Sequence, residues 1–289
     1  MPELIHTLHA SDLTQLDLQP VQHFRCLESG QVIYMPNLSF KIELPALCRS
    51  EICDTNKKNI AYDYQKQRLS GISTHNPYSS QLQTMMHAYA SYARTLVDTL
   101  LPHYQSALRW GRTSYRPVEI VGRQRSKRQD DTRIHVDAFP ATPVQGWRIL
   151  RVFCNVNPEG KPRVWHLGEP FPQVLQCFAP QLPPYSAFKA RLLNRIKLTK
   201  SLRTAYDHYM LHLHDQMKLQ DSYQAELKKT RFDFPAHSTW IVFTDQVSHA
   251  ALSGQFLLEQ TFYLPVSAMQ DPSTSPLHHI TNCEKLGRI

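Results

Sequence analysis

The chain has 289 residues, of which 42% are hydrophobic and 19% are charged. This composition is ordinary for a soluble globular protein, and the length allows one sizeable core. Lysine and arginine outnumber aspartate and glutamate by 32 to 24, and the formal net charge of +8 favours an acidic partner: nucleic acid, an anionic membrane or an acidic small molecule. No apolar run approaches the roughly twenty residues of a membrane span, which argues against an integral membrane protein.

Six cysteines are spread along the chain without a CxxC pair. A zinc site or a disulfide framework is therefore not expected, and reduced thiols are typical of a cytoplasmic protein. The first ten residues lack the basic and apolar regions of a signal peptide, which favours the same location.

The N-terminal part predicts short strands at 32–34 and 40–42. From 81 to 108 apolar residues recur at spacings of three and four, which predicts an amphipathic helix. Its methionine and aromatic stripe is expected to pack on the core rather than to bind a cofactor. The stripe consists of Leu82, Met85, Met86, Tyr89, Tyr92, Leu96, Val97 and Leu100.

Residues 109–133 are dense in arginine. The cations are Arg109, Arg112, Arg116, Arg123, Arg125, Arg128 and Arg133, with Lys127. Two interpretations are about equally supported: a solvated charged loop, or a rim that binds anions through the bidentate geometry of arginine. Nucleic-acid binding is a third interpretation, but no helix-turn-helix, RRM, KH or zinc-finger signature accompanies the loop, so no nucleic-acid partner is expected.

The segment 133–140 predicts a short strand with one unusual face. Successive side chains of a strand point to opposite sides, so His135, Asp137 and Phe139 share a face. One imidazole and one carboxylate are two thirds of the 2-His-1-carboxylate triad that binds non-heme Fe(II). The pattern alone is weak, because His-x-Asp is common by chance and a strand histidine is more often structural. His249 is the candidate third ligand: it follows a buried strand and lies 112 residues after Asp137, by 249 minus 137.

Further strands are predicted at 148–153, 238–243 and 255–264, and a loop with a short helix is predicted from Pro265 onward. In the first of these strands Arg151 shares a face with Ile149 and Phe153, and a buried arginine needs a partner. Residues 186–230 predict helices, in which His208 and His212 are interpreted as structural because no acidic motif accompanies them. The positions expected to face inward are Leu192, Leu193, Ile196, Leu202, Tyr206, Met210, Leu211, His214 and Met217.

Several long motifs resemble the Kdo hydroxylases, a family of Fe(II)/2-oxoglutarate-dependent dioxygenases that act on 3-deoxy-D-manno-oct-2-ulosonic acid (Kdo) in Gram-negative lipopolysaccharide. The similarity lies in 112–120 (RTSYRPVEI), 130–140 (DDTRIHVDAFP), 148–153 (RILRVF), 162–165 (PRVW) and 238–252 (STWIVFTDQVSHAAL). Residues 58–63 (KNIAYD) and 286–288 (LGR) are also similar. The resemblance therefore spans nearly the whole chain and is far more specific than His-x-Asp.

The resemblance implies an α+β fold with a double-stranded β-helix (jelly-roll) core and flanking helices, in a single dioxygenase domain over residues 1–289. Its parts are expected to be N-terminal strands with a supporting helix (1–110), a core with a helical insertion near 186–230 (111–265), and a tail (266–289). The resemblance implies His135, Asp137 and His249 as iron ligands. It implies 2-oxoglutarate as co-substrate, decarboxylated to succinate while a substrate C–H becomes C–OH, with ascorbate as reductant in vitro.

One position departs from the wider dioxygenase superfamily. Many members carry an arginine ten residues after the distal histidine, and a serine or threonine two residues later, to bind the far carboxylate of 2-oxoglutarate. Here these positions are Glu259 and Thr261, so the hydroxyl is retained and the cation is not. Glu259 would repel the co-substrate unless it is paired or turned away. In some branches the residue 14 positions after the metal-binding aspartate supplies the cation, which implies Arg151, with Arg163 as a second candidate.

The implied substrate is the Kdo sugar of Kdo-lipid A, which carries a carboxylate and phosphates. We expect Arg123, Arg125, Arg128 and Arg133, with Lys127, to divide between these anions and the anionic inner membrane, and Arg133 to touch the sugar acid. The expected location is the cytoplasm, with peripheral membrane contact.

Three alternatives remain at this point. They are a non-catalytic jelly-roll module that binds an acidic glycan or lipid, a dioxygenase with another acidic substrate, and a nucleic-acid demethylase on the same core. The complete set of three metal ligands favours an enzyme over a binding module, and the lack of a base-reading element disfavours the demethylase.

Overall fold

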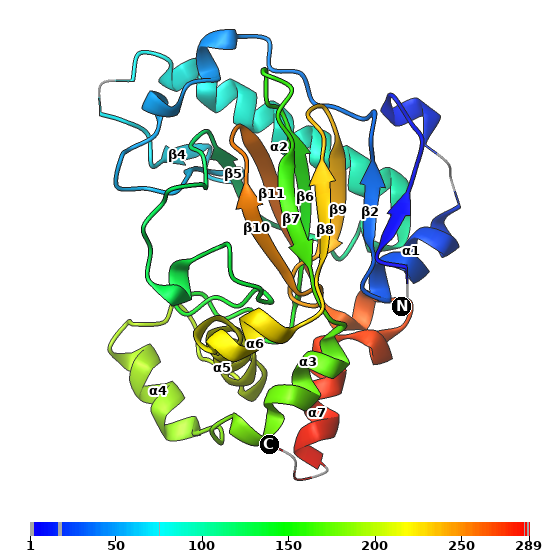
Figure 1. The fold of residues 1–289 in the computed structure, drawn as a ribbon, viewed down its shortest axis with the longest axis vertical. Coiled ribbons are helices and arrows are strands. Elements are labelled where there is room, and N and C mark those ends of the chain that lie inside the picture. Colours follow the sequence, from blue (N-terminus) through cyan, green and yellow to red (C-terminus); the bar gives the residue numbers. More distant parts are fainter. Residues whose placement is uncertain (1–2, 17–18, 75, 286, 288) are drawn as a thin grey trace.

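The computed structural model of the protein describes residues 3–16, 19–74, 76–285, 287 and 289. Two of the three residues of the C-terminal LGR motif, at 286 and 288, lie outside this part. The described strands form two sheets (Figure 1): one of eight strands in the order β1-β2-β9-β6-β11-β5-β3-β4, and one of three in the order β10-β7-β8. Neighbours are antiparallel, except for the parallel pair β1 and β2.

The strands of the larger sheet are β1 (Ile5–Thr7), β2 (Val32–Met35), β3 (Ile60–Asp63), β4 (Arg68–Ser70), β5 (Arg109–Arg116), β6 (Arg148–Asn155), β9 (Thr239–Phe243) and β11 (Leu257–Leu264). The strands of the smaller sheet are β7 (Arg163–Leu167), β8 (Thr230–Phe234) and β10 (His249–Ser253). The α-helices are α1 (Pro20–Glu28), α2 (Ser79–Leu100), α3 (Phe171–Phe178), α4 (Ala187–Arg195), α5 (Ala205–Leu219), α6 (Asp221–Glu226) and α7 (Pro276–Lys285).

The two sheets pack face to face through aromatic side chains. Trp165 of β7 meets Phe153 of β6 with ring centroids 5.1 Å apart, and Phe234 of β8 stacks on Trp240 of β9 at 3.9 Å. Every residue of β9 is buried, because both faces of the larger sheet are covered at this strand. The arrangement agrees with the predicted jelly-roll core.

Helix α2 covers the outer face of the larger sheet (Figure 1). The predicted stripe is buried, apart from Tyr92, which is half-buried. The hydroxyl of Tyr89 donates to the carbonyl oxygen of Val152 at 2.9 Å and so ties the helix to β6. The prediction of a core-facing stripe is confirmed, and the helix ends at Leu100, before the sequence turns into β5.

A second apolar cluster lies at the end of the sandwich where α3, α5, α6 and α7 gather (Figure 1). It includes Ile134 and Val136 from the segment that carries the candidate metal ligands, and Ala250 from β10. The alternation predicted for 133–140 therefore holds locally: its apolar residues face a helical layer, and the intervening histidine and aspartate face the other way.

The predicted strand at 133–140 is instead an extended segment with a single bridge, between His135 and His249. The ladder cannot continue, because the N–H of Asp137 donates to the carbonyl oxygen of Thr244, in the turn after β9, at 2.8 Å. The predicted strand at 40–42 is a loop, since the N–H of Phe40 donates to the sulfur of Cys154 rather than to a neighbouring strand.

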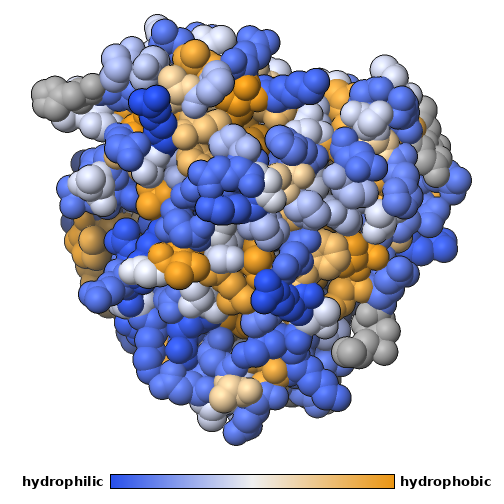
Figure 2. Space-filling view, turned by 45° about the horizontal axis from the view of Figure 1, so that its top comes forward, coloured by the Kyte–Doolittle hydropathy of each residue, from blue (hydrophilic) through white to orange (hydrophobic). Residues whose placement is uncertain are grey.

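The helical insertion begins at Phe171, earlier than the predicted boundary near 186. Within it Tyr206, Met210 and Met217 are buried as predicted, whereas Leu192, Ile196 and Leu202 are exposed. No helix in the described part of the chain has the length and hydropathy needed to cross a membrane. The face in Figure 2 is mainly hydrophilic, with hydrophobic side chains in small groups.

Candidate metal centre

The bridge between two distant segments brings the predicted ligands together. The N–H of His135 donates to the carbonyl oxygen of His249 at 3.0 Å, and the N–H of His249 donates back to that of His135 at 2.8 Å. His249 is the first residue of β10, so the smaller sheet fixes its position. Asp137 follows two residues after His135 and is held by its backbone bond to the turn after β9.

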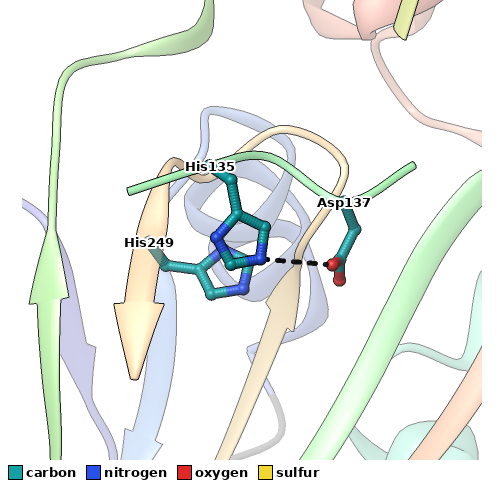
Figure 3. Close-up of side chains that lie close together, drawn as sticks. All are labelled: His135, Asp137 and His249. Carbon is teal, nitrogen blue, oxygen red and sulfur yellow. Dashed lines mark ion pairs between the residues drawn. The ribbon is translucent and has the colours of Figure 1, made fainter. Parts of the chain in front are cut away.

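The three side chains converge at one point (Figure 3). One potential ligand atom from each of His135, Asp137 and His249 lies within 4.8 Å of the others. His135 Nε2 is 3.8 Å from Asp137 Oδ1, and the two imidazole rings have centroids 4.8 Å apart. Two imidazoles and one carboxylate on one side of an ion leave the opposite side open, as the facial triad of non-heme iron requires.

Backbone carbonyl groups fix the tautomer of both histidines. His135 Nδ1 donates to the carbonyl oxygen of Arg133 at 2.8 Å, and His249 Nδ1 donates to that of Val247 at 2.8 Å. A proton on Nδ1 leaves the Nε2 lone pair free for a metal, and such a bond also orients the ring. The two residues thus have the same arrangement, each with a carbonyl group two residues earlier in the chain as its partner.

The protonation states also suit a metal. Burial lowers the pKa of His249, and burial together with Lys218 lowers the pKa of His135 well below its usual range. Burial would raise the pKa of Asp137, but the Arg151 guanidinium and the histidines outweigh it and hold that pKa below its usual range. Neutral imidazoles and an ionised carboxylate are the forms that bind metal.

The ligands lie in a cavity of about 200 Å³ that is rich in charge. Its lining includes four cations, Lys58, Arg116, Arg151 and Arg163, and three carboxylates, Asp131, Asp137 and Glu259. The protein alone therefore contributes one net positive charge, and a divalent metal would raise it to three. A cavity with this balance favours anionic ligands.

Glu259 is paired with two arginines, so it does not repel an anionic co-substrate in the way that its sequence position suggested. Arg116 Nη2 lies 2.8 Å and Arg151 Nη1 lies 3.3 Å from its two carboxylate oxygens. Burial works to raise the pKa of Glu259, but these two guanidinium groups lower it, so the side chain stays ionised. Glu259 therefore orders two cavity arginines instead of repelling an anion unopposed.

Several buried polar atoms around the cavity have no hydrogen-bond partner among the residues that the structure describes. They are the Nε atoms of Arg151 and Arg163, Nε1 of Trp165 and Oδ2 of Asp137. Oδ2 of Asp137 does lie 3.2 Å from Arg151 Nη2, as an ion pair. Unpaired buried polar atoms are costly, and a cluster of donors beside a metal-binding set indicates a site for an anionic ligand.

Arg163 is the cavity cation with the weakest compensation. Its Nη1 donates to the carbonyl oxygen of Gly254 at 2.7 Å, and within the described part of the chain it forms no ion pair. Burial, assisted by Arg116, lowers its pKa to about 9. A carboxylate bound in the cavity would supply the missing counter-charge.

Thr261, the retained hydroxyl, lies beside Arg151 in the pairing of β11 with β6. Its hydroxyl donates to Glu259 Oε1 at 3.4 Å, and Thr261 is not part of the cavity lining. The position therefore contacts the residue that orders the arginines and does not reach the cavity itself.

The loop arginines lie elsewhere. Arg133 and Lys127 both pair with Asp221, each at 2.6 Å, and Arg128 pairs with Asp215 at 3.0 Å. The Arg123 guanidinium donates to the backbone carbonyl groups of Val118 and Glu119. Arg125 is exposed and forms no ion pair with the described residues. None of these cations lines the cavity with the metal ligands.

Sequence reasoning did not single out the roles of Lys58, Arg116, Asp131 and Trp165, which all line the cavity. Trp165 stacks on His249 with ring centroids 5.0 Å apart, and Lys58 pairs with Asp131 at 3.1 Å. All four lie inside motifs that carried the family resemblance. Their position inside these motifs was a signal of functional importance, but the motifs do not indicate which of their residues face a cavity.

Comparison with known proteins places the chain in a family. The family model described as 3-deoxy-D-manno-oct-2-ulosonic acid (Kdo) hydroxylase matches residues 14–285. No curated protein sequence matched. Among solved structures the chain is similar to the Kdo hydroxylase KdoO, a non-heme Fe(II) alpha-ketoglutarate-dependent dioxygenase, in complex with cobalt(II), with 44% identity, a TM-score of 0.94, and coverage of 98% of this chain and 96% of that one.

Two further KdoO structures match with the same identity and coverage and with TM-scores of 0.93. One is in complex with alpha-ketoglutarate and Fe(III), and the other with succinate and Fe(III). The fold with its two sheets and flanking helices is thus that of a 2-oxoglutarate oxygenase. From the family model and the 44% identity over nearly the whole chain, this protein belongs to the Kdo hydroxylase family.

Proposed function

We propose that the protein is an Fe(II)/2-oxoglutarate-dependent dioxygenase that hydroxylates the Kdo sugar of Kdo-lipid A. The observation that carries the proposal is the convergence of His135, Asp137 and His249 in a cavity lined by arginines with unpaired donor atoms. Membership of the family supports the substrate, and the similarity to KdoO supports the metal and the co-substrate.

His135, Asp137 and His249 would hold the iron through a carboxylate oxygen of the aspartate and through Nε2 of each imidazole, which the hydrogen bonds at Nδ1 leave available. Iron supplies the oxygen chemistry. In the overall reaction one atom of O₂ enters the succinate formed from 2-oxoglutarate, with loss of CO₂, and the other converts a C–H of the sugar to C–OH. The protein's own contribution is orientation, charge neutralisation and exclusion of water.

Arg163 and Arg151 bind the carboxylates of 2-oxoglutarate. Among the described residues Arg163 has no ion pair, and Arg151, which lines the same cavity, has no hydrogen-bond partner for its Nε. Trp165, whose indole N–H has no partner, offers a further donor. Arg116 donates from Nε and Nη2 to Glu259 and so helps to position that carboxylate, while Thr261 supports Glu259 from two residues further along β11.

The charge of the site also suits an acidic sugar. Iron brings the cavity to three net positive charges, the two carboxylates of 2-oxoglutarate neutralise two, and one remains for the carboxylate of Kdo. Arg123, Arg125, Arg128 and Arg133 lie outside the cavity, where they meet the phosphates and the outer part of the substrate. The enzyme works in the cytoplasm, in peripheral contact with the anionic inner membrane that holds Kdo-lipid A.

The test is to incubate the purified protein with Fe(II), 2-oxoglutarate, ascorbate and Kdo-lipid A, and to measure the lipid by mass spectrometry. One added oxygen atom on the sugar, formed together with succinate, is the expected result. Succinate formed with unmodified lipid would indicate a dioxygenase with a different acidic substrate. Neither product, from protein that has been shown to bind metal, would contradict the proposal.

A further inference from the structure

The stretch 187–203, which comprises α4 and the turn that follows it, differs in charge from the rest of the chain. It holds six cations and no acidic residue: Lys189, Arg191, Arg195, Lys197, Lys200 and Arg203. The whole chain has a formal net charge of +8, so this short stretch carries most of the excess. We call it the α4 surface.

The same stretch exposes most of the large apolar side chains on the outside of the molecule. Of the eight that are exposed among the described residues, five lie in the α4 surface. They are Phe188, Leu192, Ile196, Leu198 and Leu202, and Phe188 is 75% exposed. Scattered apolar side chains are normal on a protein surface, but five in one basic segment are not scattered.

The helix presents these side chains on one stripe. Phe188, Leu192 and Ile196 are spaced four residues apart, so they follow one another along one side of α4 and its C-cap. Ala190 is buried and Leu193 half-buried, so these two mark the side on which the helix packs against the protein. The periodicity that predicted inward positions was therefore real, but the stripe it identified faces solvent.

The cations lie where they can flank this stripe. Arg191 and Arg195 each follow an apolar residue of the stripe by three positions, and both are exposed. Within the described residues no cation of the α4 surface forms an ion pair, in contrast to Lys127, Arg128 and Arg133 of the arginine loop, which are paired with Asp221 and Asp215. The positive charge of the α4 surface is thus uncompensated.

We propose that the α4 surface is the part of the protein that docks on an anionic lipid bilayer. An exposed apolar stripe between arginines and lysines fits the boundary between headgroups and acyl chains, where the apolar side chains insert and the cations contact phosphates. Charge complementarity favours the bilayer over a protein partner. The surface has six cations and no acid, so it matches a uniformly anionic surface and lacks the mixed pattern of charges that a specific protein partner would recognise. The inference rests on the proposed function, which places the substrate in a membrane, and it deepens that function.

A hollow of about 270 Å³ adjoins the α4 surface on its α5 side. Lys189 and Arg203 line it together with His208 and His212. Ala190 and Leu193 of the packed side of α4 also line it, whereas Phe188, Leu192 and Ile196 do not, so the hollow lies next to the docking face and not within the stripe. Two cations at the rim of a concave surface can still accept a phosphate headgroup.

Two hydrogen bonds to backbone carbonyl groups tie this surface to the segment that follows Asp137. Arg203 Nη2 donates to the carbonyl oxygen of Pro140 at 2.8 Å, and the N–H of Lys200 donates to that of Ala141 at 2.9 Å. Pro140 lies three residues after Asp137. Docking through the α4 surface would therefore hold the segment with the iron ligands at a fixed distance from the bilayer that carries the substrate.

The experiment is co-sedimentation of the full chain with phosphatidylcholine vesicles that contain or lack phosphatidylglycerol. Three variants are compared with the parent: Phe188→Ser with Leu192→Ser, Arg191→Glu with Arg195→Glu, and Lys66→Glu with Arg68→Glu. The last pair is a matched control, because it makes the same charge change at exposed positions on the β3–β4 hairpin, at the opposite end of the molecule (Figure 1). Thermal unfolding checks that each variant is folded.

We expect the parent to bind the phosphatidylglycerol vesicles, and both α4 variants to bind them at least about tenfold more weakly than the control does. Equal binding by parent and α4 variants, or an equal loss in the hairpin control, would overturn the inference. So would parent binding that does not depend on phosphatidylglycerol. If a folded α4 variant is unobtainable, Arg191→Gln with Arg195→Gln takes its place with the same expectation.

Hydroxylation of detergent-dispersed Kdo-lipid A, measured on the same proteins, separates the two proposals. The α4 variants should act on it like the parent, because docking is then irrelevant. A parent that hydroxylates the dispersed lipid but ignores vesicles would refute only the α4 surface. A parent that binds vesicles through α4 without hydroxylating the lipid would refute only the proposed function.

Discussion

The cavity arginines and the loop arginines come from neighbouring parts of the sequence but differ in their partners. The cavity arginines contact buried carboxylates or lack an ion pair, whereas Arg128 and Arg133 of the loop pair with acids that are themselves partly exposed. The side chains of Arg116 and Arg151 are 19% and 11% exposed and contact buried carboxylates, and Arg163 is buried without an ion pair. Arg128 and Lys127 are 62% and 51% exposed and pair with acids of α5 and α6. The number of arginines in a segment therefore says little about function, whereas burial with an incomplete set of partners says a great deal.

The contrast follows from solvation. A guanidinium group loses favourable hydration when it is buried, and its partners must compensate for that loss. An exposed pair keeps most of its hydration and contributes little to stability. A buried cation that lacks a counter-charge, such as Arg163, is thus expected to find its partner in a bound ligand.

The largest effect is expected at the metal ligands, which the cavity cations surround. His249→Ala should abolish hydroxylation and weaken metal binding by more than ~100-fold, since even the loss of a residue that only supports a metal ligand typically costs 10–100-fold. Cobalt(II) binding followed by absorption spectroscopy measures the affinity. His278→Ala, at an exposed position on α7, is the control and should bind cobalt like the parent. Full activity of His249→Ala would remove this residue from the ligand set.

The next effect tests which cavity arginine binds the co-substrate. Arg163→Ala should weaken 2-oxoglutarate binding by roughly 2–5 kcal/mol, because the bound carboxylate loses a buried charge-assisted partner. Calorimetry with the cobalt-loaded protein measures it, and metal affinity should not change because Arg163 does not contact the metal ligands. An unchanged affinity for 2-oxoglutarate would transfer the role to another cavity cation.

Arg151→Ala sharpens the distinction between the two arginines. Arg151 Nη2 lies 3.2 Å from Oδ2 of Asp137, a candidate metal ligand, so the loss of Arg151 should weaken both 2-oxoglutarate and metal binding. The expected loss of 2-oxoglutarate affinity is again roughly 2–5 kcal/mol. A variant that loses 2-oxoglutarate affinity with metal affinity intact would show that the contact with Asp137 has no influence on the ligand.

Glu259→Gln tests the pairing that orders two of the arginines. The side chain is only 4% exposed, and its loss of charge removes the carboxylate that pairs with Arg116 and leaves Arg151 with Asp137 alone. Breaking a buried ion pair typically costs about 3–5 kcal/mol, so the free energy of unfolding should fall by roughly that amount in urea denaturation. Added 2-oxoglutarate should recover more stability in the variant than in the parent, since it supplies the missing negative charge. A parent-like unfolding free energy would mean that solvent, not Glu259, screens these arginines.

The sequence led to the three candidate metal ligands, which the structure brings together, because local alternation survives without a strand. His135 and Asp137 face the cavity and Ile134 and Val136 face the helices, although one bridge replaces the predicted ladder. The cavity cations were harder to predict. Lys58 and Arg116 reach the site only through the order of β3 and β5 in the sheet, which no local pattern specifies.

Helix α4 shows a second limit of sequence patterns. Spacings of three and four identify an apolar stripe but not what covers it, so Leu192 and Ile196 were predicted to face inward and are exposed. The charge of the stretch distinguishes the two cases: residues 187–203 hold six cations and no acid, three on α4 and three after it, which favours an exposed surface over a packed one. Charge balance within a short window is thus a useful complement to periodicity.

The smallest effect is expected for the loop, and Arg133 is its most informative member. Its guanidinium donates to the carbonyl oxygen of Lys218 and pairs with Asp221, whose side chain is 65% exposed. Because Asp221 is mainly exposed and such pairs are weak, an anionic group in the outer part of the bound substrate competes with Asp221 for this cation. Arg133→Ala should therefore raise KM for detergent-dispersed Kdo-lipid A by roughly fivefold or less, with 2-oxoglutarate binding unchanged.

Asp221→Asn is the matched change on the other side of the pair, and it should leave KM unchanged or lower it by freeing the guanidinium. If Arg133→Ala impaired turnover as severely as Arg163→Ala, the distinction between loop and cavity arginines would be lost. If neither Arg133→Ala nor Asp221→Asn changed KM, Arg133 would be a structural charge without contact to the substrate.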